Sequence, residues 1–241
     1  MKVVVSKNEI LSSLIAEEFI KVIKNKPNAV LGLATGTSPL GVYANLVKAN
    51  KEGRVSFKDV TTFNLDEYVG LEGTHNQSYR YFMNDNLFNH IDIDKNKTNV
   101  LLGVGDYVSF MNKYDQMIED AGGIDIQILG IGSDGHIAFN EPGTSFDSLT
   151  HETELTEQTI KDNSRLFNDI SEVPTRAVTM GLASIMKARK IVLIATGKNK
   201  ANAIRGLLKG PMSEDMPCSI LQKHNDVTIY VDDDAYSLAK D

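Results

Sequence analysis

The chain has 241 residues, 41% hydrophobic and 24% charged, so it can bury a full core, and this composition excludes a disordered protein. Its formal net charge of −7 argues against nucleic acid or an anionic membrane as a partner. A single cysteine excludes an intramolecular disulfide, and the sequence has neither a signal-peptide core nor an apolar run of roughly 20 residues, so a cytoplasmic location is predicted.

The N-terminal part alternates between short apolar runs and amphipathic helical patterns. Residues 2–5 predict a strand. Ser6 and Glu9 have the spacing of a capping box and precede a helix that Pro27 ends. A fully apolar strand follows at 29–35.

The next helix is predicted to begin with Ser38 as its N-cap and Pro39 as its first residue. The same alternation of apolar runs and helical patterns continues to the end of the chain. Further strands are predicted at 60–65, 99–104, 124–131, 176–180, 190–196 and 226–231, and further helices at 78–91, from Asp106 to Gly122, at 182–188 and at 199–209.

Apolar strands without alternation indicate a sheet that is buried on both faces. Because helices separate these strands, the predicted fold class is α/β: a doubly wound, mostly parallel, Rossmann-like sheet with helices on both faces. No linker or repeat interrupts the chain, so a single domain over residues 1–241 is expected. Ligands of such sheets bind beyond the carboxyl ends of the strands, so the polar residues that follow each apolar run are the candidates for a site.

The first such segment contains Thr35, Gly36, Thr37 and Ser38, between the strand at 29–35 and a helix. The glycine lets the backbone approach a ligand, and hydroxyl groups and first-turn amides can donate hydrogen bonds to an anion. An ordinary capped turn is the structural alternative. The segment is not a P-loop, because the Gly-Lys-Ser/Thr ending is missing.

Asp66 and Glu67 directly follow the strand at 60–65. Adjacent residues of an extended segment point to opposite sides, so only one of the two can face a pocket and accept a proton there. The alternative is a solvated carboxylate in a loop.

The stretch LGIGSDGHIAFNEP, residues 129–142, places Asp134, His136 and Glu141 directly after a buried strand. Either carboxylate can orient His136 for proton transfer near neutral pH, and a structural histidine is the alternative. The glycines also match the dinucleotide pattern G-x-G-x-x-G. Pro142 opposes the helix that a dinucleotide site needs, so a loop folded around a substrate is favoured.

Two cations lie outside these three segments. Arg165, and Lys200 just past the strand at 190–196, could each neutralise a phosphate held by residues 35–38, and solvated side chains are the alternative. Cys218 is predicted to be a core or surface thiol and not a nucleophile.

Taken together, six segments resemble the glucosamine-6-phosphate deaminase (glucosamine-6-phosphate isomerase) family. The combination of LDEY with DGHIAFNEPG is specific, and the matches span most of the chain. They are LATGTSPLGVY (33–43), FNLDEYVGL (63–71), NQSYRYFM (76–83), GIGSDGHIAFNEPG (130–143), NSRLF (163–167) and GKNKA (197–201).

The resemblance implies a role for each residue singled out above. Asp66 would be the base that moves a proton between C2 and C1 of a sugar. His136, with Asp134 and Glu141 as its carboxylate partners, would help to open the pyranose ring. A segment at about 150–180 would act as a mobile lid. The sugar phosphate would be bound by Thr35, Gly36, Thr37, Ser38, Arg165 and Lys200.

The implied reaction converts D-glucosamine 6-phosphate and water into D-fructose 6-phosphate and ammonia in amino-sugar catabolism, without a metal or redox cofactor. A small sugar phosphate is the expected partner, and a homo-oligomer is left open. Some members of the family carry an allosteric site for N-acetylglucosamine 6-phosphate with basic residues shortly after the catalytic loop. Residues 142–160 contain no lysine or arginine, so this regulation is predicted to be absent.

Two other functions share the expected fold. A 6-phosphogluconolactonase activates water and has no use for a second base aimed at a C–H bond, so the stretches LDEY (65–68) and AFNEPG (138–143) favour the deaminase. A sugar-phosphate-sensing module needs a basic DNA-binding segment. The predicted sheet begins too early in the chain to leave room for one, and the negative net charge does not fit it.

Overall fold

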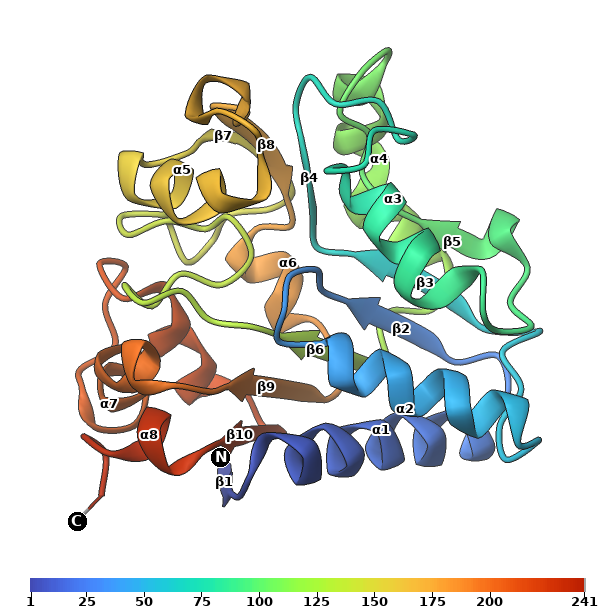
Figure 1. The fold of residues 1–241 in the computed structure, drawn as a ribbon, viewed down its shortest axis with the longest axis horizontal. Helices are drawn as coiled ribbons and strands as arrows, with labels where there is room; N and C mark the ends of the chain where they lie inside the picture. The colour runs from blue at the N-terminus through green and yellow to red at the C-terminus, as the bar shows by residue number, and fades with distance from the viewer. Residues whose placement is uncertain (241) are drawn as a thin grey trace.

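A seven-stranded parallel sheet forms the centre of the computed structural model, which describes residues 1–240 without the side chains of Asp162 and Leu166 (Figure 1). Its strands are β1 (Lys2–Val5), β2 (Val30–Leu33), β3 (Thr61–Asn64), β5 (Thr98–Asn99), β6 (Ile126–Leu129), β9 (Ile191–Ala195) and β10 (Val227–Val231). They lie in the order β1-β10-β9-β6-β2-β3-β5, and every neighbouring pair is parallel.

The chain changes direction across this sheet between β2 and β6. From β2 it builds outward through β3 and β5, and it then returns to the other side of β2 with β6 and continues to β9 and β10. Loops that follow β2 and β6 therefore leave the sheet side by side and in opposite directions. This is the crevice where doubly wound folds bind their ligands.

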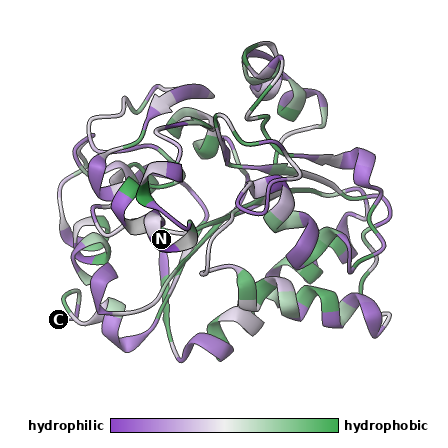
Figure 2. Cartoon of the chain, turned by 45° about the horizontal axis from the view of Figure 1, so that its top comes forward, coloured by the Kyte–Doolittle hydropathy of each residue, from purple (hydrophilic) through white to green (hydrophobic). Residues whose placement is uncertain are grey.

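Helices cover both faces of the sheet, as the apolar strands predict. Every residue of β2, β6, β9 and β10 is buried, and successive side chains of a strand point to opposite faces. Hydrophobic residues run along these central strands (Figure 2). The helices are α1 (Asn8–Asn25), α2 (Leu40–Lys51), α3 (Tyr79–Met83), α4 (Tyr107–Asp120), α5 (Glu157–Asn163), α6 (Leu182–Met186), α7 (Ala201–Lys209) and α8 (Asp233–Tyr236).

A second, antiparallel sheet lies beyond the carboxyl end of β3. It consists of β4 (Asp66–Tyr68), β8 (Arg176–Thr179) and β7 (His151–Glu154), in the order β4-β8-β7. The strand predicted at 176–180 therefore belongs here, and β7 is not predicted because its sequence, HETE, has no apolar run. Tyr68 and Ala177 of this sheet form a small apolar cluster with Phe139 and Leu155.

Several predicted element ends are wrong. The strand expected at 99–104 is only two residues long, because the chain leaves the sheet and Gly103 packs against the carbonyl oxygen of Tyr68. Neither Ser6 nor Ser38 caps a helix: Lys7 and Pro39 occupy the N-cap positions of α1 and α2, without side-chain hydrogen bonds.

The main apolar cluster joins α1, α2, α4, α6 and α7 to the parallel sheet around one core. Asp241, the last residue of the expected domain, lies outside the described residues. No helix among the described residues is long and apolar enough to cross a membrane.

Candidate active site

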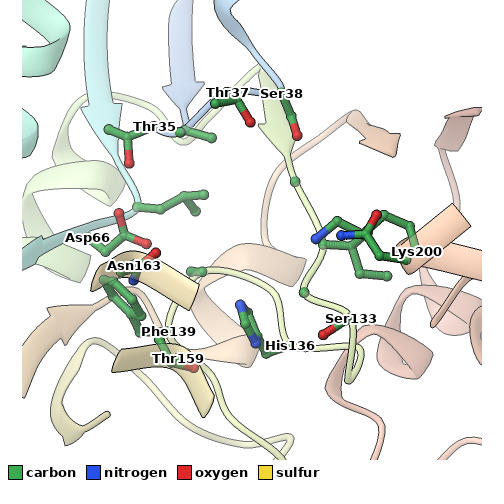
Figure 3. A pocket seen from close by; sticks show the side chains of 18 of the residues that line it. Thr35, Thr37, Ser38, Asp66, Ser133, His136, Phe139, Thr159, Asn163 and Lys200 are labelled. Atoms are coloured by element: carbon green, nitrogen blue, oxygen red, sulfur yellow. The ribbon is translucent and has the colours of Figure 1, made fainter. Parts of the chain in front are cut away.

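A cavity of about 840 Å³ lies at the carboxyl ends of β2, β3, β6 and β9, at the change of chain direction (Figure 3). Most of the residues predicted for the site meet there, although they come from distant parts of the sequence. Asp134 and Glu141 do not line the cavity but lie behind His136. The predicted residues that line it are Thr35, Gly36, Thr37, Ser38, Asp66, His136, Arg165 and Lys200.

The turn after β2 can bind an anion. Gly36 has φ +89°, a left-handed conformation that a side chain would strain, and no described side chain caps α2 after it. The amides of Gly41 and Val42 in the first turn and the hydroxyls of Thr35, Thr37 and Ser38 lie at the positive end of a helix of 12 residues. This end of the cavity suits a phosphate.

Asp66 faces the cavity and Glu67 points away from it, as their adjacency in an extended segment predicts. The Glu67 carboxylate accepts hydrogen bonds from the backbone amides of Tyr68, Tyr79 and Arg80, at 2.9, 2.9 and 3.0 Å. Burial raises its pKa to about 7.

Asp66 itself is only 7% exposed. Its burial, together with the negative charge of Glu67, raises the pKa of Asp66 to about 8. A carboxylate of this kind binds a proton more readily than one in water does, which is the property of a general base.

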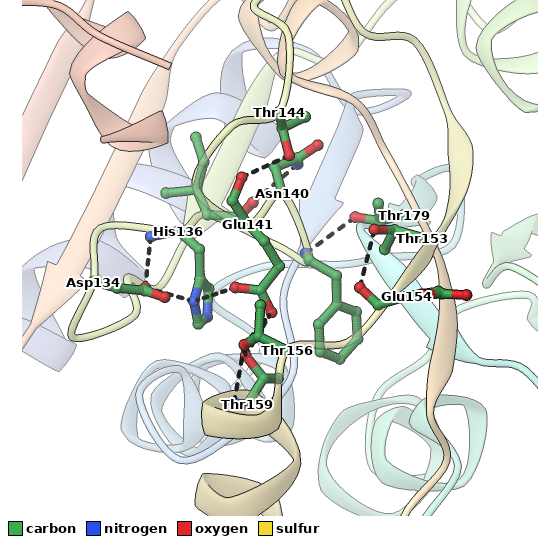
Figure 4. A network of polar contacts seen from close by, with 12 residues as sticks. Asp134, His136, Asn140, Glu141, Thr144, Thr153, Glu154, Thr156, Thr159 and Thr179 are labelled. Atoms are coloured by element: carbon green, nitrogen blue, oxygen red, sulfur yellow. Dashed lines mark hydrogen bonds and ion pairs between the residues drawn. The ribbon is translucent and has the colours of Figure 1, made fainter. Parts of the chain in front are cut away.

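His136 lies between two carboxylates. Its Nδ1 atom is 2.8 Å from Asp134 Oδ1 and 3.5 Å from Glu141 Oε2, and it forms no aligned hydrogen bond with either (Figure 4). The sequence left open which carboxylate contacts the histidine, and the structure places Asp134 nearer. The His136 side chain lowers the pKa of Asp134 to about 2, so this carboxylate is charged at neutral pH.

The loop that carries His136 needs its glycines. A Cβ atom on Gly132 would lie 2.3 Å from the imidazole of His136, so a side chain there would displace the ring. Gly135 has φ +87°, and a tight turn with a backbone bridge from Ile137 to Asn140 follows it. No helix begins at these glycines, so the arrangement differs from a dinucleotide site.

The segment around α5 covers the side of the cavity next to Glu141. Glu141 is 6% exposed, and its Oε1 atom accepts a hydrogen bond of 2.5 Å from the hydroxyl of Thr159 on α5. The N-cap residue of this helix, Thr156, lies beside Thr159 at 3.0 Å. Neither threonine is among the predicted site residues, although the sequence has the spacing of a helix N-cap threonine with a second threonine three residues later.

Cations line the cavity from two directions. Lys200 comes from the turn that precedes α7, and Arg165 from the turn that follows α5. Lys161 of α5 also lines the cavity and is not predicted. Positive charges that line an open cavity concentrate a dianionic ligand in a protein that is acidic as a whole.

A metal site and a cysteine nucleophile fit this geometry less well than acid–base chemistry does. The donor atoms of Asp134, His136 and Glu141 lie within 4.8 Å of one another, a grouping that a metal ion could use. A metal can bind at Nδ1 only where this atom carries no proton. Cys218 is buried, and burial raises the pKa of its thiol to about 12, so it is not a nucleophile.

Known proteins resemble this chain over its whole length. Two curated relatives are named glucosamine-6-phosphate deaminase: one from Clostridium perfringens (strain 13 / Type A), 50% identical with all of both chains covered, and one from Thermoanaerobacter sp. (strain X514), 52% identical with 100% of this chain and 96% of the relative covered. A solved structure described as a monomeric glucosamine-6-phosphate deaminase is 45% identical, with a TM-score of 0.96 over 99% of this chain and 100% of that one.

More distant structures share the fold alone. A 6-phosphogluconolactonase from Trypanosoma brucei is 17% identical, with a TM-score of 0.78 over 98% of this chain and 97% of that one. The family model described as glucosamine-6-phosphate isomerases/6-phosphogluconolactonase matches residues 8–230. The chain therefore belongs to the glucosamine-6-phosphate isomerase/6-phosphogluconolactonase family.

Proposed function

We propose that this protein converts D-glucosamine 6-phosphate and water into D-fructose 6-phosphate and ammonia. The observation that carries the proposal is the placement of two acid–base groups in one cavity that cations also line. Asp66 is a buried carboxylate with a raised pKa, and His136 is an imidazole backed by two carboxylates. Relatives that are 50% identical over the full length carry the name of this activity.

The phosphate group is proposed to bind at the turn after β2. Amides and hydroxyls of residues 35–38 donate hydrogen bonds to its oxygens, and Arg165 and Lys200 neutralise its charge. The sugar then extends from this end toward Asp66 and His136. We propose that the segment at about 150–180, of which α5 covers the cavity, acts as a lid within a single domain.

Ring opening comes first, because a closed hemiacetal has no acidic hydrogen at C2. His136 takes the proton of the O1 hydroxyl and returns a proton to the ring oxygen O5, so the C1–O5 bond breaks and an aldehyde forms at C1. Asp134 and Glu141 balance the positive charge that the imidazole carries between these two transfers.

Proton transfer between two carbons follows. Asp66 removes the C2 proton while the 2-ammonium group of the substrate gives a proton to O1, which leaves a cis-enolamine. Asp66 then returns its proton to C1, which gives an iminium ion at C2. Water adds to C2 and ammonia leaves, which produces the ketone of D-fructose 6-phosphate. Each step is a general acid–base reaction, and none requires a change of oxidation state by a cofactor.

The proposed reaction is a step of amino-sugar catabolism, and we place it in the cytoplasm. A small sugar phosphate is the proposed partner, and a site lined by residues of one chain is compatible with a monomer or a homo-oligomer. Because residues 142–160 contain no lysine or arginine, we expect hyperbolic substrate dependence. A sigmoidal curve that N-acetylglucosamine 6-phosphate relieves would contradict that expectation.

The test is the release of ammonia and D-fructose 6-phosphate from D-glucosamine 6-phosphate, without added metal and beside the Asp66→Asn variant. Equal amounts of both products from the wild-type protein, and almost none from the variant, support the proposal. Folded wild-type protein that forms no product contradicts it. Hydrolysis of 6-phosphogluconolactone, measured in parallel, would then identify the lactonase alternative.

A further inference from the structure

Glu141 connects the segment around α5 to His136. Its two carboxylate oxygens face different partners: Oε1 accepts a hydrogen bond from Thr159, and Oε2 lies 3.5 Å from Nδ1 of His136 (Figure 4). Both Glu141 and Thr159 are almost completely buried, at 6% and 5% exposure. Water therefore does not replace the threonine as a donor in this arrangement.

The backbone of Glu141 is fixed independently of α5. Its carbonyl oxygen accepts hydrogen bonds from the amide and the hydroxyl of Thr144, at 3.0 and 2.7 Å. Its side chain, in contrast, has Thr159 as its nearest hydrogen-bond donor. The Oε2 atom is buried and has no hydrogen bond among the described residues. The direction of the carboxylate thus depends on α5, while the position of the residue does not.

Thr159 is not needed to cap its own helix. The hydroxyl oxygen of Thr156 accepts the amide of Thr159 at 3.2 Å, which is the capping hydrogen bond of α5. The hydroxyl proton of Thr156 faces the hydroxyl oxygen of Thr159 at 3.0 Å, nearer than Glu141 at 3.4 Å. The hydroxyl proton of Thr159 is left for Glu141, so the three groups form one directed chain.

We propose that Thr159 is a positioning residue that turns the carboxylate of Glu141 toward His136 when α5 covers the cavity. This inference rests on the proposed function, because it states that the lid segment controls the ring-opening step. With α5 in place, Glu141 faces the imidazole and balances its charge. With α5 displaced, the carboxylate loses its donor and its fixed direction, so His136 acts efficiently only on a covered substrate.

The test compares three variants of the full-length protein. Thr159→Val removes the hydroxyl and keeps the shape, whereas Thr159→Ser keeps the hydroxyl. Thr153→Val is the matched control, because the hydroxyl of Thr153 in β7 contacts only the carbonyl oxygen of Glu154 in this network (Figure 4). The steady-state kinetics of D-glucosamine 6-phosphate deamination give kcat and KM for each variant.

Thr159→Val is expected to lower kcat roughly 10- to 100-fold with little change in KM, the range for a lost hydrogen bond to a charged group. Thr159→Ser and Thr153→Val are expected to retain the wild-type kcat. A second measurement uses 2-amino-2-deoxy-D-glucitol 6-phosphate, an acyclic analogue with no ring to open. Thr159→Val is expected to bind it as the wild type does, because Asp66 and the phosphate end are unaltered.

An unchanged kcat in Thr159→Val would overturn the inference. Equal losses in Thr159→Val and Thr159→Ser, or weakened binding of the acyclic analogue by Thr159→Val, would also overturn it, because they would show that the threonine only supports the local structure. Wild-type protein that forms no ammonia would instead remove the proposed function itself. The two failures are therefore distinguishable.

Discussion

The surroundings on the two sides of the cavity shift the pKa of an aspartate in opposite directions. Asp66, at the end of β3, is buried beside the negative Glu67, and its pKa rises to about 8. Asp134, in the loop after β6, lies 2.8 Å from His136, and its pKa falls to about 2. Both follow a strand of the same sheet, and their residue type is the same.

This difference assigns the two aspartates to different tasks. A group whose pKa lies near the working pH can take and return a proton, whereas a permanently charged group can only orient and balance a cation. The chemistry of a carboxylate in this fold is thus decided by what lies beside the strand end. Predictions that separate the two aspartates test this conclusion.

The largest expected effect is at Asp66. Asp66→Asn removes the proton acceptor while the side chain keeps its size, and kcat is expected to fall by about 10²- to 10⁴-fold. Ammonia release measured at saturating substrate checks this. A variant that retains a tenth or more of the wild-type kcat would show that another group removes the C2 proton.

A smaller loss is expected at Asp134. Asp134→Asn keeps a polar neighbour for His136 but removes the charge, so kcat is expected to fall roughly 10- to 100-fold, the range for a lost interaction with a charged group. Binding of the acyclic analogue is the control, and it should match the wild type. If Asp134→Asn is as inactive as Asp66→Asn, the two aspartates do not differ in role as described.

A substitution of Lys200 tests whether the cations that line the cavity bind the substrate. Both aspartates can act only when the substrate is bound. Lys200→Met is expected to raise KM on the order of tenfold with a nearly unchanged kcat. Lys198→Met, in the same turn but outside the cavity lining, is the matched control. Equal changes of KM in the two variants would show that only the net charge of the surface matters.

Much of the fold could be predicted from the sequence, because apolar runs such as VLGL and IVLIA are buried on both faces and carry a strong signal. The second sheet could not. The sequence of β7, HETE, is polar. β4 begins two residues after β3 ends, so the sequence gives no sign that a second strand starts there. These strands pair through their backbones at the edge of the site, and hydrophobicity gives no sign of that.

The candidate site could be predicted in part, for a related reason. Asp66, His136 and Lys200 each follow an apolar run, and parallel strands bring such positions together. Thr159 and Lys161 lie on a short helix in a polar segment, and the strand before it, β7, has no apolar run. Only the folded chain shows that this helix covers the cavity and that one of its hydroxyls contacts Glu141.

The most direct test of the comparison is the pH dependence of kcat/KM for the wild type, Glu67→Gln and Asp134→Asn. Asp66 must lose its proton to act as a base, so kcat/KM of the wild type is expected to fall as the pH drops below about 8.

Glu67→Gln removes the neighbouring charge that raises the pKa of Asp66, so this fall should move to lower pH. In Asp134→Asn the fall should stay at the wild-type pH, although the overall rate is lower. Ionisation of the substrate is common to the three enzymes and cancels in the comparison. A fall that does not move in Glu67→Gln, or that moves as far in Asp134→Asn, would contradict the assignment of Asp66 as the base.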